Sequence, residues 1–182
     1  MSDPDAIVVW RELFWNPDPP TLETVCRHLG RETRYFSHGR VGLSVAEHSI
    51  LVANAASSGL RLKALLHDAG EAYTGDIPKQ VKQAFPGLAR WCDEIQRETI
   101  LVLGFESPTT REAEAIKIAD RLAFVAEVRF LFGAGRAANF VLAEFYGGGP
   151  LNLEAAEAIE VRGLGAEAAS AELYDEIRKA AT

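Results

Sequence analysis

Histidine and aspartate side chains interrupt apolar segments of this chain of 182 residues. His67 and Asp68 are adjacent and follow the apolar run 64–66, while His48 lies in an earlier apolar segment and Asp120 in a later one. Burying an unpaired imidazole or carboxylate is costly, and both groups are ligands of divalent metal ions. The four side chains are therefore candidate ligands of one ion. The alternative is a core histidine bonded to a neighbouring helix, beside an aspartate that faces solvent.

The spacing of these residues limits how they can share an ion. Adjacent residues project about 100° apart on a helix, so His67 and Asp68 bind together only if their helix turns one side toward the metal. Glu71 follows His67 by four residues and would fall on the same helix face. This position favours a role for Glu71 beside the metal over that of a solvated helix carboxylate.

The elements that carry these residues all have helical periodicity. Helices are expected over residues 21–29, 44–57, 60–73, 88–103, 109–132, 136–145, 152–161 and 166–181. A further helix is expected to start at Asp76 as its N-cap, with Pro78 in the first turn. Residues 31–43 are expected to form a loop with a short extended piece at 34–36. The sequence therefore predicts an all-α protein.

Two of these helices begin with a capping-box pattern, in which a hydroxyl and a glutamate satisfy each other's backbone amides. Ser44 and Glu47 form the pattern before His48, and Thr109 and Glu112 form it before Asp120. The helix that carries His48 and the helix that carries Asp120 should therefore each start at a defined residue.

Composition and charge exclude several classes of protein. A net charge of −7 argues against a non-specific nucleic-acid coat. Two distant cysteines argue against a zinc finger, an iron–sulfur site or a disulfide framework. No apolar run is long enough to cross a membrane, and residues 1–5 lack the features of a secretory signal, so a cytoplasmic location is expected. The length fits one domain over residues 1–182.

The ligand order and the string His67-Asp68-Ala69-Gly70-Glu71-Ala72-Tyr73-Thr74-Gly75-Asp76-Ile77-Pro78-Lys79-Gln80-Val81-Lys82 resemble a known family. The chain resembles the HD-domain metal-dependent phosphohydrolases. Within them, it is similar to the branch of bacterial 5′-deoxynucleotidases and phage dATP triphosphohydrolases. The resemblance covers roughly residues 20–132, and the C-terminal part, 133–182, carries no matching motif. It implies a single domain with the all-helical HD fold.

The resemblance assigns roles to individual residues. It implies His48, His67, Asp68 and Asp120 as metal ligands, Glu71 and Asp76 as catalytic residues, and Arg34, Tyr35, His38, Thr74 and Lys82 as substrate-binding residues. The planar fork of Arg34 suits phosphate. Tyr35 stands where relatives commonly carry tryptophan, which leaves the base preference open.

The resemblance also implies an activity. One divalent ion (Co, Mn, Zn or Mg) would serve a 5′-deoxynucleotidase that converts a deoxynucleoside monophosphate to a deoxynucleoside and phosphate. The alternatives are a dATP-type triphosphohydrolase and a non-catalytic nucleotide sensor. The expected partner is a small deoxynucleotide, not a nucleic-acid polymer or a membrane. By analogy with the family, a homo-oligomer is expected.

Overall fold

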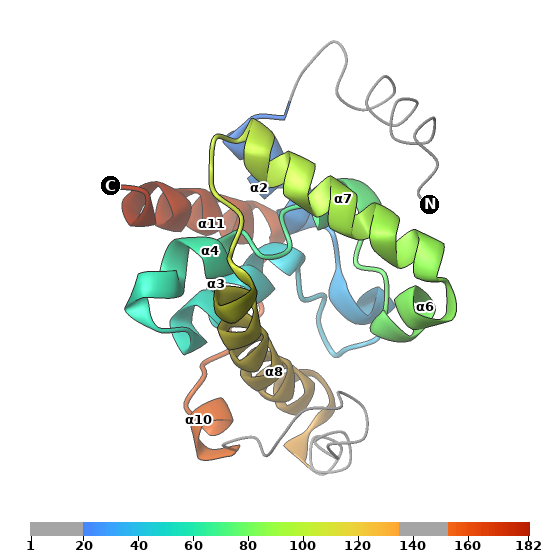
Figure 1. Cartoon of the computed structure of the whole chain (residues 1–182). Coiled ribbons are helices and arrows are strands. Elements are labelled where there is room, and N and C mark those ends of the chain that lie inside the picture. The colour runs from blue at the N-terminus through green and yellow to red at the C-terminus, as the bar shows by residue number, and fades with distance from the viewer. Residues whose placement is uncertain (1–19, 135–152) are drawn as a thin grey trace.

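The structure is a computed structural model and describes residues 20–134 and 153–182. Its α-helices are α2 (Leu22–Arg31), α3 (Val45–Ala55), α4 (Arg61–Leu65), α5 (Glu71–Thr74), α6 (Lys79–Ala84), α7 (Pro86–Val102), α8 (Thr110–Phe132), α10 (Leu153–Glu157) and α11 (Ala166–Ala180) (Figure 1). Two 3₁₀ turns, η1 (Arg34–Ser37) and η2 (Ser58–Leu60), lie between them. These residues contain no strand, only an isolated antiparallel bridge between Thr33 and Ser44. The all-α prediction is confirmed.

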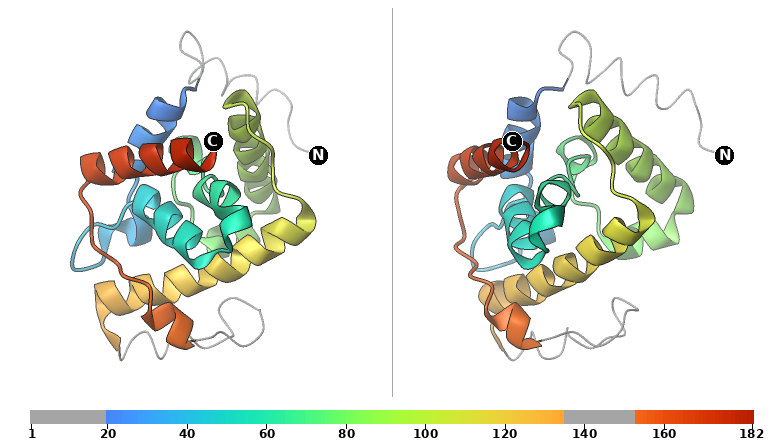
Figure 2. Two further views of the ribbon diagram at one scale, coloured as in Figure 1. Left: turned by 90° about the vertical axis from the view of Figure 1, so that its left-hand side faces the viewer. Right: turned by 60° about the vertical axis from the view of Figure 1, so that its left-hand side comes forward.

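Helix α3 is the centre of the core. Every residue from Val45 to Ala53 is buried, because α2, α4, α8 and α11 all pack against it. Figure 2 shows α8 along one side of α3 and α11 along the other. A helix covered on all sides is apolar all round, which is how most of α3 reads. His48 therefore lies in the interior of the protein.

The two capping boxes behave differently. At α8, Thr109 and Glu112 satisfy each other's backbone amides as predicted. At α3, Ser44 accepts from the Glu47 amide, but the prediction that Glu47 reaches back to Ser44 is wrong. The buried Glu47 carboxylate instead accepts from the amides of Arg162, Gly163 and Leu164 at 2.6–2.9 Å. It thereby fastens the segment before α11 to the helix that carries His48.

The helix expected over 60–73 is interrupted. Helix α4 ends at Leu65, a turn follows, and α5 begins at Glu71. The side chain of Gln96 on α7 donates to the Leu66 carbonyl at 2.8 Å and accepts from the Gly70 amide at 2.5 Å. Those two groups would bond each other in a continuous α-helix. The side-chain amide of Gln96 bonds to both groups in place of that helical bond, so the helix is interrupted between Leu66 and Gly70.

Two other local expectations are wrong. Asp76 is not the N-cap of the next helix, because α6 starts at Lys79 with Pro78 as its N-cap. The Asp76 amide donates to the Glu32 side chain at 3.2 Å. The piece at 34–36 is not extended. It is the 3₁₀ turn η1, in which Tyr35, Phe36 and Ser37 have φ values of 56°, 51° and 59°.

The remaining helices can be compared with the expected ranges. The helix expected over 152–161 is seen as α10, which ends at Glu157, and the one expected over 136–145 lies outside the described residues. In the ranges 20–134 and 153–182, no helix combines the length and the hydropathy that crossing a membrane requires.

Gly70 should be essential to this packing. An added Cβ at Gly70 would lie 2.7 Å from the Gln96 Cα and 2.8 Å from its amide nitrogen. We expect Gly70→Ala to lower the free energy of unfolding by about 1–3 kcal/mol, the usual cost of overpacking. Gly59→Ala is the matched control, because no atom of the described residues lies within 4 Å of the added Cβ there. Urea unfolding measures both, and equal stabilities of the two variants would contradict the close contact.

Candidate metal centre

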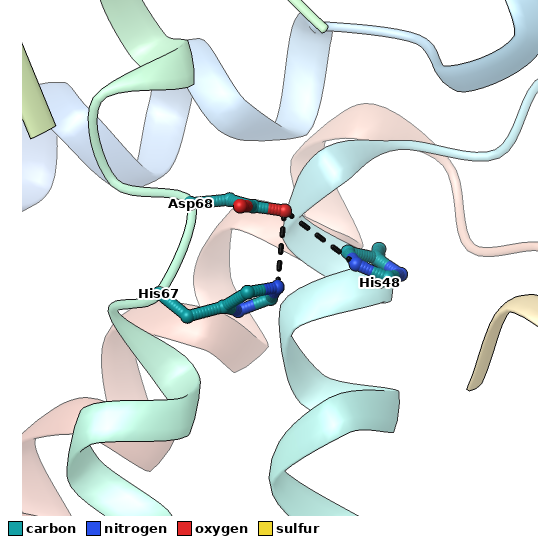
Figure 3. A group of neighbouring side chains, drawn as sticks. All are labelled: His48, His67 and Asp68. Atoms are coloured by element: carbon teal, nitrogen blue, oxygen red, sulfur yellow. Dashed lines mark ion pairs between the residues drawn. The ribbon is translucent and has the colours of Figure 1, made fainter. Parts of the chain in front are cut away.

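His48, His67 and Asp68 come together in the interior, with one donor atom from each lying within 4.8 Å of the others. Figure 3 shows one oxygen of the Asp68 carboxylate facing a nitrogen of each ring. Its Oδ2 atom lies 3.5 Å from His48 Nε2 and 3.1 Å from His67 Nε2. Helix α3 supplies one ligand-type side chain, and the turn after α4 supplies the other two. This group has the donor types and proximity that a divalent ion requires.

Both imidazoles are oriented so that Nε2 faces the group. His67 Nδ1 lies 2.8 Å from the Ala64 carbonyl, which only accepts, so Nδ1 carries the hydrogen. His48 Nδ1 lies 2.5 Å from Glu127 Oε1. The two Nε2 atoms are buried and have no hydrogen-bond partner in the described part of the chain. Buried nitrogen atoms without partners are rare, whereas metal-ligating histidines regularly bond a carbonyl or carboxylate through the other nitrogen.

The interrupted helix explains how adjacent residues reach one point. His67 and Asp68 lie in the turn between α4 and α5, so the expectation that both sit in one helix is wrong. The turn removes the separation of about 100° that a helix would impose on neighbours. It also removes the helix-face argument for Glu71. Glu71 nonetheless lines a pocket of about 100 Å³ together with His67 and Asp68.

Asp120 approaches the centre from α8. Its Oδ1 atom lies 3.2 Å from His48 Nε2, although Asp120 is not part of the group of three. Burial raises the pKa of Asp120 and of Asp68, but the neighbouring histidines outweigh burial and the net pKa shift of both is downward. Burial and Arg34 lower the pKa of His48, whereas Glu127 and Asp120 raise it to about 10 overall. The carboxylates around His48 thus stabilise positive charge at this point.

Glu127 is the site residue that the sequence analysis missed. It is fully buried on α8, and besides His48 it accepts from Arg34 Nε at 3.1 Å and from the Tyr35 hydroxyl at 2.5 Å. Burial raises its pKa, but Arg34 and His48 lower it overall, so Glu127 is an ionised carboxylate. The sequence carries one sign of its role, since Glu127 is an acidic residue within the otherwise apolar run 123–128. It follows Asp120 by seven residues, which is two helical turns.

Arg34 and Tyr35 line one side of a pocket of about 230 Å³, together with Phe36, Asp76 and Phe124 among others. Arg34 Nη1 lies 4.0 Å from Asp76 Oδ1. The Tyr35 ring packs against Phe124 with 6.1 Å between ring centroids, and its hydroxyl is bonded to Glu127. Phe36 is 70% exposed and offers a ring face that Tyr35 does not. Phe36 was not singled out from the sequence.

The smaller pocket, of about 100 Å³, collects three more of the predicted residues: Glu71, Thr74 and Lys82. Lys82 Nζ lies 3.4 Å from Glu71 Oε1, while Glu71 Oε2 is buried without a hydrogen-bond partner among the described residues. Burial, Asp68 and Asp76 raise the pKa of Glu71 well above its usual range. His38 is exposed and lines neither pocket.

Comparison with known proteins gives one distant relationship. No family model matches the chain. It is 32% identical over 75 residues to the uncharacterized protein YfdR of Escherichia coli (strain K12). The aligned stretch takes in 41% of this chain and 38% of YfdR, so the chain covers well under half of that protein. The similarity supports a distant relationship to YfdR.

Replacing one imidazole should abolish metal retention. We expect His67→Ala to lose stoichiometric divalent metal, because it removes one of two buried nitrogen donors. His28→Ala on α2 is the control, since that ring packs edge-on against Tyr73 and is not a member of the group. Elemental analysis after dialysis measures both. Full metal content in His67→Ala would remove this histidine from the centre.

Proposed function

We propose that this chain is a metal-dependent phosphohydrolase of the HD-domain type that acts on deoxynucleotides. Its principal reaction would be that of a 5′-deoxynucleotidase, which converts a deoxynucleoside monophosphate to a deoxynucleoside and phosphate. The observation that carries the proposal is the pair of buried Nε2 atoms of His48 and His67, which face the Asp68 carboxylate and have no hydrogen-bond partner among the described residues.

The donor set suits one divalent ion. His48, His67 and Asp68 would hold it, and Asp120 lies close enough to His48 to complete the set. Imidazole and carboxylate together are compatible with Zn, Co, Mn or Mg. Such an ion, when bound, lowers the pKa of water and neutralises charge on a phosphoryl group.

Two pockets suggest how a nucleotide would lie, the larger lined by Arg34 and Tyr35 and the smaller by His67 and Asp68. The larger pocket is mainly aromatic and apolar, with Phe36 exposed at its edge, which suits a base. Arg34 lines this pocket and interacts electrostatically with His48 and Asp68, so its guanidinium would meet the phosphate end. In the smaller pocket, Lys82 would offset the negative charge of a phosphoryl oxygen.

Glu71 would act as the general acid–base of the reaction. Its Oε2 atom is buried without a hydrogen-bond partner in the described chain, and burial, Asp68 and Asp76 raise its pKa well above that of an ordinary carboxyl. A group whose pKa lies near the working pH can both accept and return a proton. Asp76 lies on the other side of Arg34 and would position that guanidinium rather than exchange protons.

Glu71→Gln should separate chemistry from metal binding. We expect kcat to fall by about 10²–10⁴-fold, the range of general acid–base catalysis, while metal content stays unchanged. Glu114→Gln, on the exposed face of α8, is the control. Steady-state phosphate release and elemental analysis measure the two properties. A wild-type kcat in Glu71→Gln would exclude it from the reaction.

A second candidate is a deoxynucleoside triphosphate hydrolase, and one observation favours it. Burial and the cations Lys117 and Arg121 lower the pKa of Lys79, while Asp120 opposes that shift. Lys79 therefore lies within electrostatic reach of Lys117, Arg121 and Asp120, and these cations would serve a longer phosphate chain. This candidate shares the metal centre and the cleaved bond, which joins the α-phosphorus to O5′, and differs in the length of the phosphate chain that is released.

Product analysis over the four deoxynucleoside monophosphates and triphosphates, with each metal, tests the proposal. Inorganic phosphate from monophosphates supports the 5′-deoxynucleotidase. Tripolyphosphate from triphosphates supports the second candidate instead. Nucleotide binding without any product would contradict both and indicate a non-catalytic sensor.

A further inference from the structure

We propose that Glu127 couples metal binding to the conformation of the turn Arg34–Ser37, so that the ion and the turn order each other. The inference rests on the proposed function only in taking the His48 site as a divalent metal site. It makes Glu127 a positioning residue, because Glu127 bonds to a candidate ligand and to a candidate substrate contact rather than to the substrate.

The two oxygens of this one carboxylate serve two parts of the site. Oε1 lies 2.5 Å from His48 Nδ1. Oε2 accepts from the Tyr35 hydroxyl at 2.5 Å and from Arg34 Nε at 3.1 Å. A carboxylate is planar and rigid, so any shift that weakens one set of bonds moves the other oxygen as well. Because Glu127 is fully buried, bulk water is not at hand to replace a lost donor.

The turn needs such support. Tyr35, Phe36 and Ser37 have φ values of 56°, 51° and 59°, a region that residues with a Cβ seldom adopt. A run of such residues persists only where surrounding contacts impose it. Apart from Glu127, those contacts include the Ser37 hydroxyl donating to Thr33 Oγ1 and the Arg34 amide donating to the Leu43 carbonyl, both at 2.8 Å.

Metal binding would strengthen the same contacts. If His48 ligates through Nε2, its hydrogen must reside on Nδ1 and point to Glu127. A cation on the ring makes that N–H a stronger donor, which fixes Glu127 in the position from which it also holds Tyr35 and Arg34. Linkage is reciprocal, so the contacts of the turn must raise metal affinity by the same factor.

Tyr35 separates this coupling from a direct effect on the metal. Its hydroxyl donates to Glu127 rather than to a candidate metal ligand. Tyr35→Phe keeps the ring and its packing against Phe124, and removes one donor from Glu127. Tyr174→Phe on α11 is the matched control, because it removes a hydroxyl from a half-buried ring remote from the centre.

The experiment measures Zn²⁺ affinity of the full chain by competition with a chromogenic chelator. We expect Tyr35→Phe to bind Zn²⁺ about 3- to 10-fold more weakly, a factor that corresponds to the net contribution of one typical hydrogen bond. Glu127→Gln should bind it about 10- to 100-fold more weakly, the usual cost of losing the partner of a metal-ligating histidine. Tyr174→Phe should match wild type within about twofold.

Hydrogen exchange supplies a second readout that does not depend on activity. Zn²⁺ should slow exchange of the Arg34 and His38 amides, which bond within and beside the turn, and this protection should shrink in Tyr35→Phe. Equal Zn²⁺ affinities of wild type and Tyr35→Phe, or exchange that Zn²⁺ does not change, would each overturn the coupling. Tyr35→Phe decides the matter even if Glu127→Gln fails to fold.

These measurements are made without nucleotide, so they are independent of the proposed reaction. Coupling without hydrolysis of any deoxynucleotide would reject the proposed reaction alone. Hydrolysis without coupling would reject this inference alone. A wild-type chain that binds no divalent ion would reject both.

Discussion

Much of the polar interior is arranged around one histidine in the middle of a wholly buried helix, because burying an imidazole without partners is costly. His48 occupies this place on α3. One nitrogen bonds Glu127, and the other faces carboxylates from the turn after α4 and from α8. Leaving those groups unpaired would cost several kcal/mol each. The contacts of this one ring therefore fix α3, α8 and the turn after α4 relative to one another.

The break between α4 and α5 is the second constraint. A continuous helix would point His67 and Asp68 in directions about 100° apart. The Gln96 amide interrupts the helix by bonding the Leu66 carbonyl and the Gly70 amide. Helix α7 thus decides the local geometry of two residues far from it in sequence. Gly70 permits the approach because it has no Cβ to meet the Gln96 backbone.

Two buried carboxylates tie distant parts of the chain to the helix that carries His48. Glu47 bonds the amides of 162–164 and so anchors the segment that leads into α11. Glu127 bonds Arg34 and Tyr35 and so anchors the turn before α3. The C-terminal region carries no recognised motif, yet it is fastened to the helix that carries the first candidate ligand.

The sequence by itself determined the local features of this protein. Apolar periodicity predicted α2, α3, α7 and α8, and the Ala- and Glu-rich composition of 166–181 predicted α11. Hydroxyl–glutamate spacing predicted the start of α8. These signals act within one or two helical turns. The tertiary structure decided the partners of the buried charges. Ser44-x-x-Glu47 reads as a capping box, yet Glu47 bonds residues that lie more than a hundred positions away. The helix break after Leu65, the left-handed turn at Tyr35 and the role of Glu127 likewise depend on groups from other helices. A local pattern cannot encode them, because the free energy of a buried polar group depends on which partner the folded chain brings within hydrogen-bonding distance.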